Sequence, residues 1–109
     1  MGQQEQTLWS HEEISIAKTA LQKAHRSEIS ALVSYVQAQA SVVATPEDVW
    51  QLHDFLSAKR HEIDGKYDDR ESFLMYTLSR LIKDGLLTLT ELDGLSVDKK
   101  TKVNLLTRM

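Results

Sequence analysis

The sequence predicts an all-α protein with a long helical stalk and a small helical head. Helix-start patterns recur along its 109 residues, strand patterns are nearly absent, and residues 3–45 contain no glycine or proline. A chain of this length holds one small domain with one modest core. We therefore expect a flexible N-terminus over residues 1–9 and a single helical domain over residues 10–109, with stalk helices at about 10–64 and a head at about 66–109.

The first helix has a complete start signal and an apolar stripe. Ser10 can cap the backbone while Glu13 reaches back to it, and Trp9 and Ile14 are spaced to pack together as a staple. Apolar residues then recur every three or four positions, with an interruption at Glu28. A second stripe makes the later part of the helix apolar on two sides. It comprises Ile29, Leu32, Val33, Val36, Ala40 and Val43.

The first helix is too long for the rest of the chain to cover. A helix from about residue 11 to 43 is roughly 50 Å long at ~1.5 Å per residue, whereas a compact domain of this size has a radius of gyration near ~13 Å. Because no helix breaker lets it fold back, we expect another chain to cover it. The expected assembly is an antiparallel or crossed homodimer of the first two helices. Its interface is expected to contain Val33, Val36, Val49, Leu52 and Leu56.

The second helix has clear signals at both ends. Thr45 can cap it, Pro46 suits its first turn, and the acids that follow interact favourably with the helix N-terminus. Gly65 is placed to end it, so it should run to Ile63 or Asp64.

The head is expected to contain short helices. Asp68 or Asp69 should open the first of them, which carries a leucine-rich stripe and stops at Gly85. Thr88 begins a capping-box pattern that opens a very short helix, and Ser96 can cap the last one.

Composition and charge exclude several classes of partner. The net charge of −3 offers no basic face for nucleic acid, and the absence of cysteine excludes disulfides and thiolate metal sites. No apolar run is long enough to span a membrane and no signal peptide is recognisable, so we expect a cytoplasmic protein. Residues 45–71 carry four Lys/Arg against eight Asp/Glu, and residues 72–109 carry six against four. This asymmetry suits a protein partner, although a solvated surface explains it equally well.

The second helix carries a polar flank beside its apolar face. At ~100° per residue, Trp50, His53, Asp54, Arg60 and His61 fall within one sector. Tryptophan and arginine are enriched at interface hot spots, which favours a protein-binding surface. Each residue alone has a plainer explanation, because a tryptophan is more often in the core and an arginine at an apolar edge extends its guanidinium into water.

A metal site or an acid–base catalytic site on this flank is a weaker interpretation. The metal ligands would be His53, His61, Glu62 and Asp64. The two histidines point ~80° apart on the helix, however, and no HExxH-like pair is present. No nucleophile is paired with a base. We therefore expect no metal and no catalysis.

Residues 52–70, LHDFLSAKRHEIDGKYDDR, closely resemble the signature of the fluorescence recovery proteins of cyanobacteria. Weaker similarity covers most of the chain, including residues 36–41. The resemblance implies an all-helical dimer with extended paired helices and a compact head. It also implies binding to the red form of the orange carotenoid protein, chiefly to its C-terminal domain, near the cytoplasmic face of the thylakoid. That binding would speed return to the orange form and restore phycobilisome fluorescence, without a cofactor.

The resemblance also implies which residues make contact. The family's functional patch maps onto Trp50, His53, Asp54 and Arg60. A second contact region in the head maps onto position 76 and Lys102. The family has phenylalanine at position 76 and this chain has Tyr76, so its hydroxyl must stay in water or find a partner.

Asp54 and Arg60 are poorly placed to pair within one helix. They lie six residues apart, so their side chains point ~120° from each other. Across a two-fold interface Asp54 of one chain can meet Arg60 of the other, and the contact is made twice. We expect such a cross-chain pair.

Two other functions remain as alternatives. The first is a dimeric helical adaptor with the same surface and a different protein client. The second, which is weaker, is a small metal-dependent hydrolase.

Overall fold

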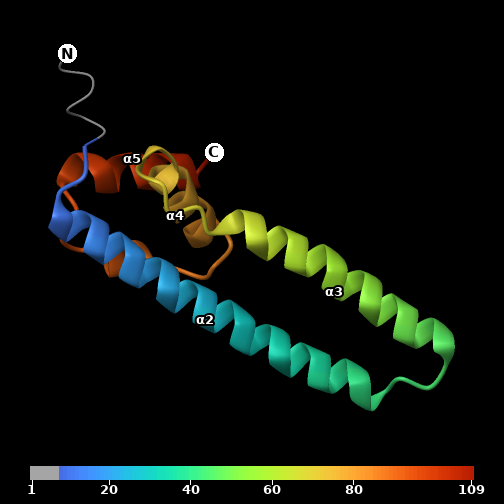
Figure 1. Ribbon diagram of the computed structural model, residues 1–109. Coiled ribbons are helices and arrows are strands. Elements are labelled where there is room, and N and C mark those ends of the chain that lie inside the picture. Colours follow the sequence, from blue (N-terminus) through green and yellow to red (C-terminus); the bar gives the residue numbers. More distant parts are fainter. Residues whose placement is uncertain (1–7) are drawn as a thin grey trace.

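The computed structural model describes residues 8–109, and the regular elements over this range are all helices (Figure 1). In chain order they are α2 (His11–Ser41), α3 (Pro46–Lys66), η1 (Glu71–Phe73), α4 (Leu74–Lys83), η2 (Leu89–Leu92) and α5 (Val97–Thr107). The predicted all-α class and long first helix are confirmed. Of the N-terminus expected to be flexible, residues 1–7 lie outside the described part, and Trp9 is buried in the core.

The helix starts follow the sequence signals. The Ser10 hydroxyl accepts the Glu13 N–H, and the Glu13 carboxylate accepts the Ser10 N–H, each at 3.0 Å. Thr45 and Asp48 form the same reciprocal pair at the start of α3, at 3.2 and 3.1 Å. Ser96 caps α5 through its side chain. These short-range patterns therefore fix where the helices begin.

Three helix boundaries differ from the sequence expectation. α2 ends at residue 41 rather than 43, and α3 continues through Gly65 to Lys66, whose side chain bonds to α2. The expected helix start at Asp68 or Asp69 is wrong, because the Asp68 carboxylate accepts the Arg70 N–H at 3.1 Å in a local turn. The regular helix α4 begins later, after η1.

The molecule is elongated. Its extents are 60 × 24 × 23 Å and its radius of gyration is 17.3 Å, against ~13 Å for a compact chain of this length. α2 and α3 run in opposite directions, joined by residues 42–45, and the shorter helices gather at one end (Figure 1). We call residues 29–66 the stalk, and residues 8–28 together with 67–109 the head. Within the described range, no helix is long and apolar enough to cross a membrane.

The apolar core lies in the head. Its fully buried large side chains are Leu74, Leu78, Leu81, Leu92 and Val103. The beginning of the chain adds a wall of Trp9, Ala17, Ala20, Leu21 and Ala24. The head is therefore built from α2 as well as from the expected residues 66–109. Among the described residues, none from α3 belongs to this core.

One turn in the head requires a glycine. Gly94 has a φ of 108°, a backbone conformation that L side chains rarely adopt. A Cβ atom at this position would also collide with the side chain of Ile16. The turn between η2 and α5 can therefore lie directly against α2.

Candidate protein-binding surface

Three of the four expected patch residues form one exposed cluster on α3. Trp50 is 63% exposed, and its ring centroid lies 6.0 Å from that of His53 in an edge-to-face arrangement. His53 Nδ1 lies 3.2 Å from Asp54 Oδ1. Arg60, whose side chain is 86% exposed, lies apart, with its Nε 3.8 Å from Asp64 Oδ2. Trp50, His53, Asp54 and Arg60 are called the α3 patch below.

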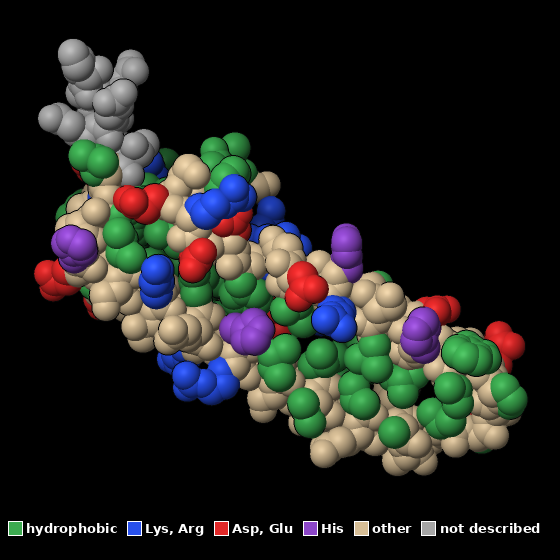
Figure 2. All heavy atoms as spheres, in the orientation of Figure 1, with side chains coloured by type: hydrophobic (Ala, Val, Ile, Leu, Met, Phe, Trp, Pro, Cys, Tyr) green, Lys and Arg blue, Asp and Glu red, His purple; other side chains and the backbone are tan. Residues whose placement is uncertain are grey.

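Apolar side chains gather on the stalk, towards the end away from the head (Figure 2). Val33 and Val49 are 50% and 47% exposed. Val36, Leu52 and Leu56 are partly buried. These five expected interface residues are called the apolar stalk face below. Monomeric proteins rarely expose large contiguous apolar patches, and such patches commonly mark interaction sites.

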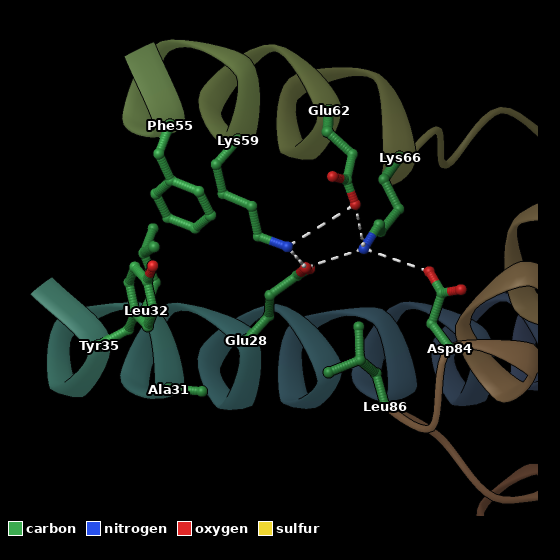
Figure 3. A pocket seen from close by; sticks show the side chains of 10 residues that line it. All are labelled: Glu28, Ala31, Leu32, Tyr35, Phe55, Lys59, Glu62, Lys66, Asp84 and Leu86. Atoms are coloured by element: carbon green, nitrogen blue, oxygen red, sulfur yellow. Dashed lines mark hydrogen bonds and ion pairs between the residues drawn. The ribbon is translucent and has the colours of Figure 1, made fainter. Parts of the chain in front are cut away.

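A groove of about 470 Å³ lies between the two stalk helices and the head. Its apolar end contains Tyr35 and Phe55, whose ring centroids are 4.7 Å apart. Its other end is charged, with side chains from α2, α3 and the end of α4 pointing towards one another (Figure 3). Along this groove the stalk helices are thus joined by an aromatic contact at one end and by charged side chains at the other.

The charged end is a network around two buried side chains, Glu28 and Lys66, and it was not predicted from the sequence. We call it the junction cluster. Its members are Glu28, Lys59, Glu62, Lys66 and Asp84, which Figure 3 shows, together with Tyr67. Lys66 Nζ lies 2.8 Å from Glu28 Oε2, 3.2 Å from Glu62 Oε2 and 3.3 Å from Asp84 Oδ2. Glu28 also accepts the Tyr67 hydroxyl at 2.7 Å. The sequence signal was the interruption of the apolar stripe at Glu28.

Hydrogen bonds and ion pairs keep Glu28 and Lys66 ionised. Burial alone would raise the pKa of Glu28, but hydrogen bonds from Lys66 and Tyr67 hold this pKa below its ordinary value. Burial alone would lower the pKa of Lys66, but its three carboxylate partners raise this pKa above its ordinary value. Burial and the Glu28 carboxylate together raise the pKa of the Tyr67 hydroxyl. Lys66 is therefore a cation and Glu28 an anion around neutral pH.

A second buried ion pair ties the two ends of the head together. Glu13 accepts the backbone N–H of Ser96 at 2.9 Å and lies 3.1 Å from Lys99 Nζ. The Lys99 ammonium lies 5.3 Å from the centre of the Trp9 ring. Burial alone would raise the pKa of Glu13, but hydrogen bonds from Ser10, Ser96 and Lys99 bring it down to about 2. The sequence pattern predicts Glu13 as a cap but does not predict this long-range link.

The two expected head residues are both exposed. Tyr76 on α4 is 63% exposed, and Lys102 lies on α5, which packs against α4. Phe73, just before α4, is 43% exposed, and the Arg70 guanidinium lies 4.5 Å from its ring centre. This cation–π contact is a further exposed feature that sequence analysis did not single out.

The histidine and carboxylate side chains of α3 do not converge. In the described part of the chain, no group of three or more His, Asp or Glu side chains is placed to hold a metal ion. Glu62 lies against Lys66, and Asp64 lies against Arg60. The carboxylates of the hypothetical metal site are thus directed towards cations of the protein.

An elongated all-helical chain that exposes the apolar stalk face and the α3 patch is typical of the class of helical proteins that act by binding other proteins. The chain matches the family model described as photoprotection regulator fluorescence recovery protein over residues 9–107. It is 48% identical over 101 residues to the fluorescence recovery protein of Synechocystis sp. PCC 6803, covering 93% of each chain.

Solved structures agree with this match. The fluorescence recovery protein of Fremyella diplosiphon matches with a TM-score of 0.91 and 51% identity, over 94% of this chain and all of that one. The Synechocystis structure matches with a TM-score of 0.91 and 47% identity, over 94% of this chain and 100% of the other. The chain belongs to the fluorescence recovery protein family, whose members are photoprotection regulators and not enzymes.

Proposed function

We propose that the chain acts as a homodimer that binds the light-activated red form of the orange carotenoid protein, chiefly through the C-terminal domain of that protein. Binding accelerates the return of the carotenoid protein to its resting orange form and ends quenching of phycobilisome fluorescence. This takes place in the cytoplasm, beside the thylakoid membrane that carries the phycobilisomes. The carotenoid belongs to the partner, so the regulator requires no cofactor of its own.

The observation that carries this proposal is the adjacency of two surfaces on α3. Val49, Leu52 and Leu56 belong to the apolar stalk face, and the α3 patch lies on the same helix. In a dimer that buries the apolar stalk face, Trp50 and His53 would lie beside the interface. A second chain would then place two copies of the patch on one assembly.

The mechanism is acceleration of a slow domain reassociation in the client. Contacts speed such a step only when they are stronger at the barrier than in the starting red form. A regulator that holds one domain and guides the other lowers the cost of finding the docked orientation. Release after the step requires weaker affinity for the orange form than for the red form.

Dark recovery of the photoactivated carotenoid protein tests this function. The absorbance change from red to orange is followed after the light is switched off, with and without the regulator. We expect the wild-type chain to accelerate recovery and Trp50→Ala to abolish most of the acceleration. Ala58→Ser, at an exposed position outside the patch on the same helix, is the matched control and should leave it unchanged. No acceleration by the wild-type chain would favour an adaptor with another client.

The head contact has a separate test in the same assay. We expect Tyr76→Ala and Lys102→Glu each to slow client recovery while the dimer keeps its size, because both residues lie outside the stalk. Tyr76→Phe, which retains the ring, should recover most of the activity. Unaltered recovery in both Tyr76→Ala and Lys102→Glu would remove the head from the client interface.

A further inference from the structure

Towards its end the α3 helix has two buried side chains, the apolar Ile63 and the charged Lys66. Among the described residues the head core contains none from α3. At the end of α3, the Lys66 ammonium instead bonds to Glu28 on α2 and lies 3.3 Å from Asp84 at the end of α4. The lysine thus connects three segments of the chain at the point where the stalk meets the head (Figure 3).

The contacts of Lys66 restrict the orientation of α3. The Lys66 side chain is 2% exposed, and a buried ammonium is stable only while carboxylates surround it. Glu28 and Asp84 come from α2 and from the end of α4, and Glu62 comes from α3 itself. Lys59 and Tyr67 complete the set of charged and titratable groups around Glu28. Few orientations of α3 keep all of these hydrogen bonds and ion pairs at the same time.

The surroundings leave α3 room to move if this connection is lost. The groove of about 470 Å³ runs directly beside the junction cluster. Towards the far end of the stalk, the aromatic pair Tyr35 and Phe55 supplies a contact between α2 and α3. Apolar contacts tolerate sliding and rotation, whereas paired charges at hydrogen-bond distance do not.

We propose that Lys66 is a positioning residue that, with Glu28 and Asp84, fixes the orientation of α3 relative to the head. It thereby sets the separation between the α3 patch and the exposed head residues Tyr76 and Lys102. Where client activity is concerned, this inference rests on the proposed function. Two contact sites held at a fixed separation bind one client more tightly than either site alone, because the second contact becomes intramolecular.

Distances between spin labels test the positioning directly and need no client. The chain contains no cysteine, so Ala58→Cys on α3 and Thr101→Cys on α5 provide two unique label sites, both exposed. The labelled chain is refolded with an excess of unlabelled chain, so that each dimer carries one labelled protomer. We expect one narrow distance distribution in the otherwise wild-type chain. Lys66→Met, which keeps length and removes charge, should broaden it or shift its mean beyond the original width.

Two further variants separate positioning from general destabilisation. Lys66→Arg retains the cation and should restore a narrow distribution. Lys18→Met, the same substitution at an exposed lysine of the head, is the matched control and should leave the distances unchanged. If Lys66→Met does not fold, Asp84→Asn removes only the contact of Lys66 with the end of α4 and should broaden the distribution in its place. A folded Lys66→Met or Asp84→Asn chain with the wild-type distribution would overturn the inference.

Client recovery supplies an independent second measurement. We expect Lys66→Met to raise the regulator concentration needed for half-maximal acceleration by at least about tenfold, with less change in the maximal rate, because each contact keeps its own side chains. An unchanged half-maximal concentration alongside broadened distances would refute the link to the client. If the wild-type chain fails to accelerate recovery, the proposed function fails, while the distance measurement still decides the role of Lys66.

Discussion

The head and the stalk bury their apolar side chains to very different extents, although both are helical. Leu78 and Leu81 in the head have no exposed surface, whereas Val33 and Val49 in the stalk are 50% and 47% exposed. The head closes around its own core, to which the start of α2 contributes. The stalk leaves its apolar face open. The head therefore buries its apolar side chains within a single chain, whereas the stalk is suited to burying them against a partner.

The largest expected effect is on the stalk, from a charge on its apolar face. Val49→Glu should weaken dimerisation by about 3–5 kcal/mol, because the interface would bury an unpaired carboxylate. Ala58→Glu, at an exposed position of the same helix, should leave the dimer intact. Analytical ultracentrifugation over a range of concentrations gives both dissociation constants. Equal constants for Val49→Glu and wild type would place the interface elsewhere.

A cavity in the head should lower the stability of the fold without weakening the dimer. Leu78→Ala removes a side chain with no exposed surface, and should lower the free energy of unfolding of the head by about 3 kcal/mol. Because the side chain lies far from the apolar stalk face, the dimer dissociation constant should stay unchanged while the variant is folded. Urea unfolding, followed together with the molecular mass, separates the two quantities. A large loss of dimerisation in this variant would mean that head and stalk are not independent.

The buried Glu13 should make the head sensitive to acid. Its pKa is lowered from 4.5 to about 2, so its contribution is fully present above pH 4.5 and is lost as the pH falls towards 2. Glu13→Gln should therefore destabilise the head near neutral pH by on the order of 2 kcal/mol. The difference from wild type should shrink at pH ~3. Unfolding curves at both pH values test this, with the exposed Glu12→Gln as control.

The smallest expected effect concerns a pair of exposed charges on the stalk. The Asp54 and Arg60 side chains are 81% and 86% exposed in the single chain, so a cross-chain pair between them should contribute about 1 kcal/mol at most. A double-mutant cycle with Asp54→Leu and Arg60→Leu on dimer dissociation measures this coupling. We also expect Arg60→Leu to impair client recovery. Strictly additive effects on dissociation would assign Arg60 to direct contact with the client.

Features set by neighbouring residues could be predicted from the sequence. The capping boxes at Ser10 and Thr45 join residues three positions apart, so their spacing is visible in the sequence. The exposed α3 patch and the open apolar stalk face could also be anticipated, because helical periodicity alone assigns residues to faces. The family signature added the prediction of which residues contact the client.

The long-range charge pairs could not be predicted in this way. Glu28 and Lys66 are 38 positions apart, and Glu13 and Ser96 are 83 positions apart. Such pairs depend on how the helices pack, and any acidic residue on an apolar stripe has many candidate partners. The late start of α4 was missed for a different, local reason, because the Asp68 side chain accepts the N–H of Arg70 two positions away instead of capping a helix.

The molecular mass of the unmodified chain in solution tests most directly whether the stalk is completed by a second copy. Light scattering coupled to size exclusion should give about 25 kDa at micromolar concentration, twice the 12.4 kDa of one chain. The mass should fall towards that of one chain only on strong dilution. A mass of 12.4 kDa at micromolar concentration would show that the apolar stalk face is stable in water without a partner, and the proposed dimer would be wrong.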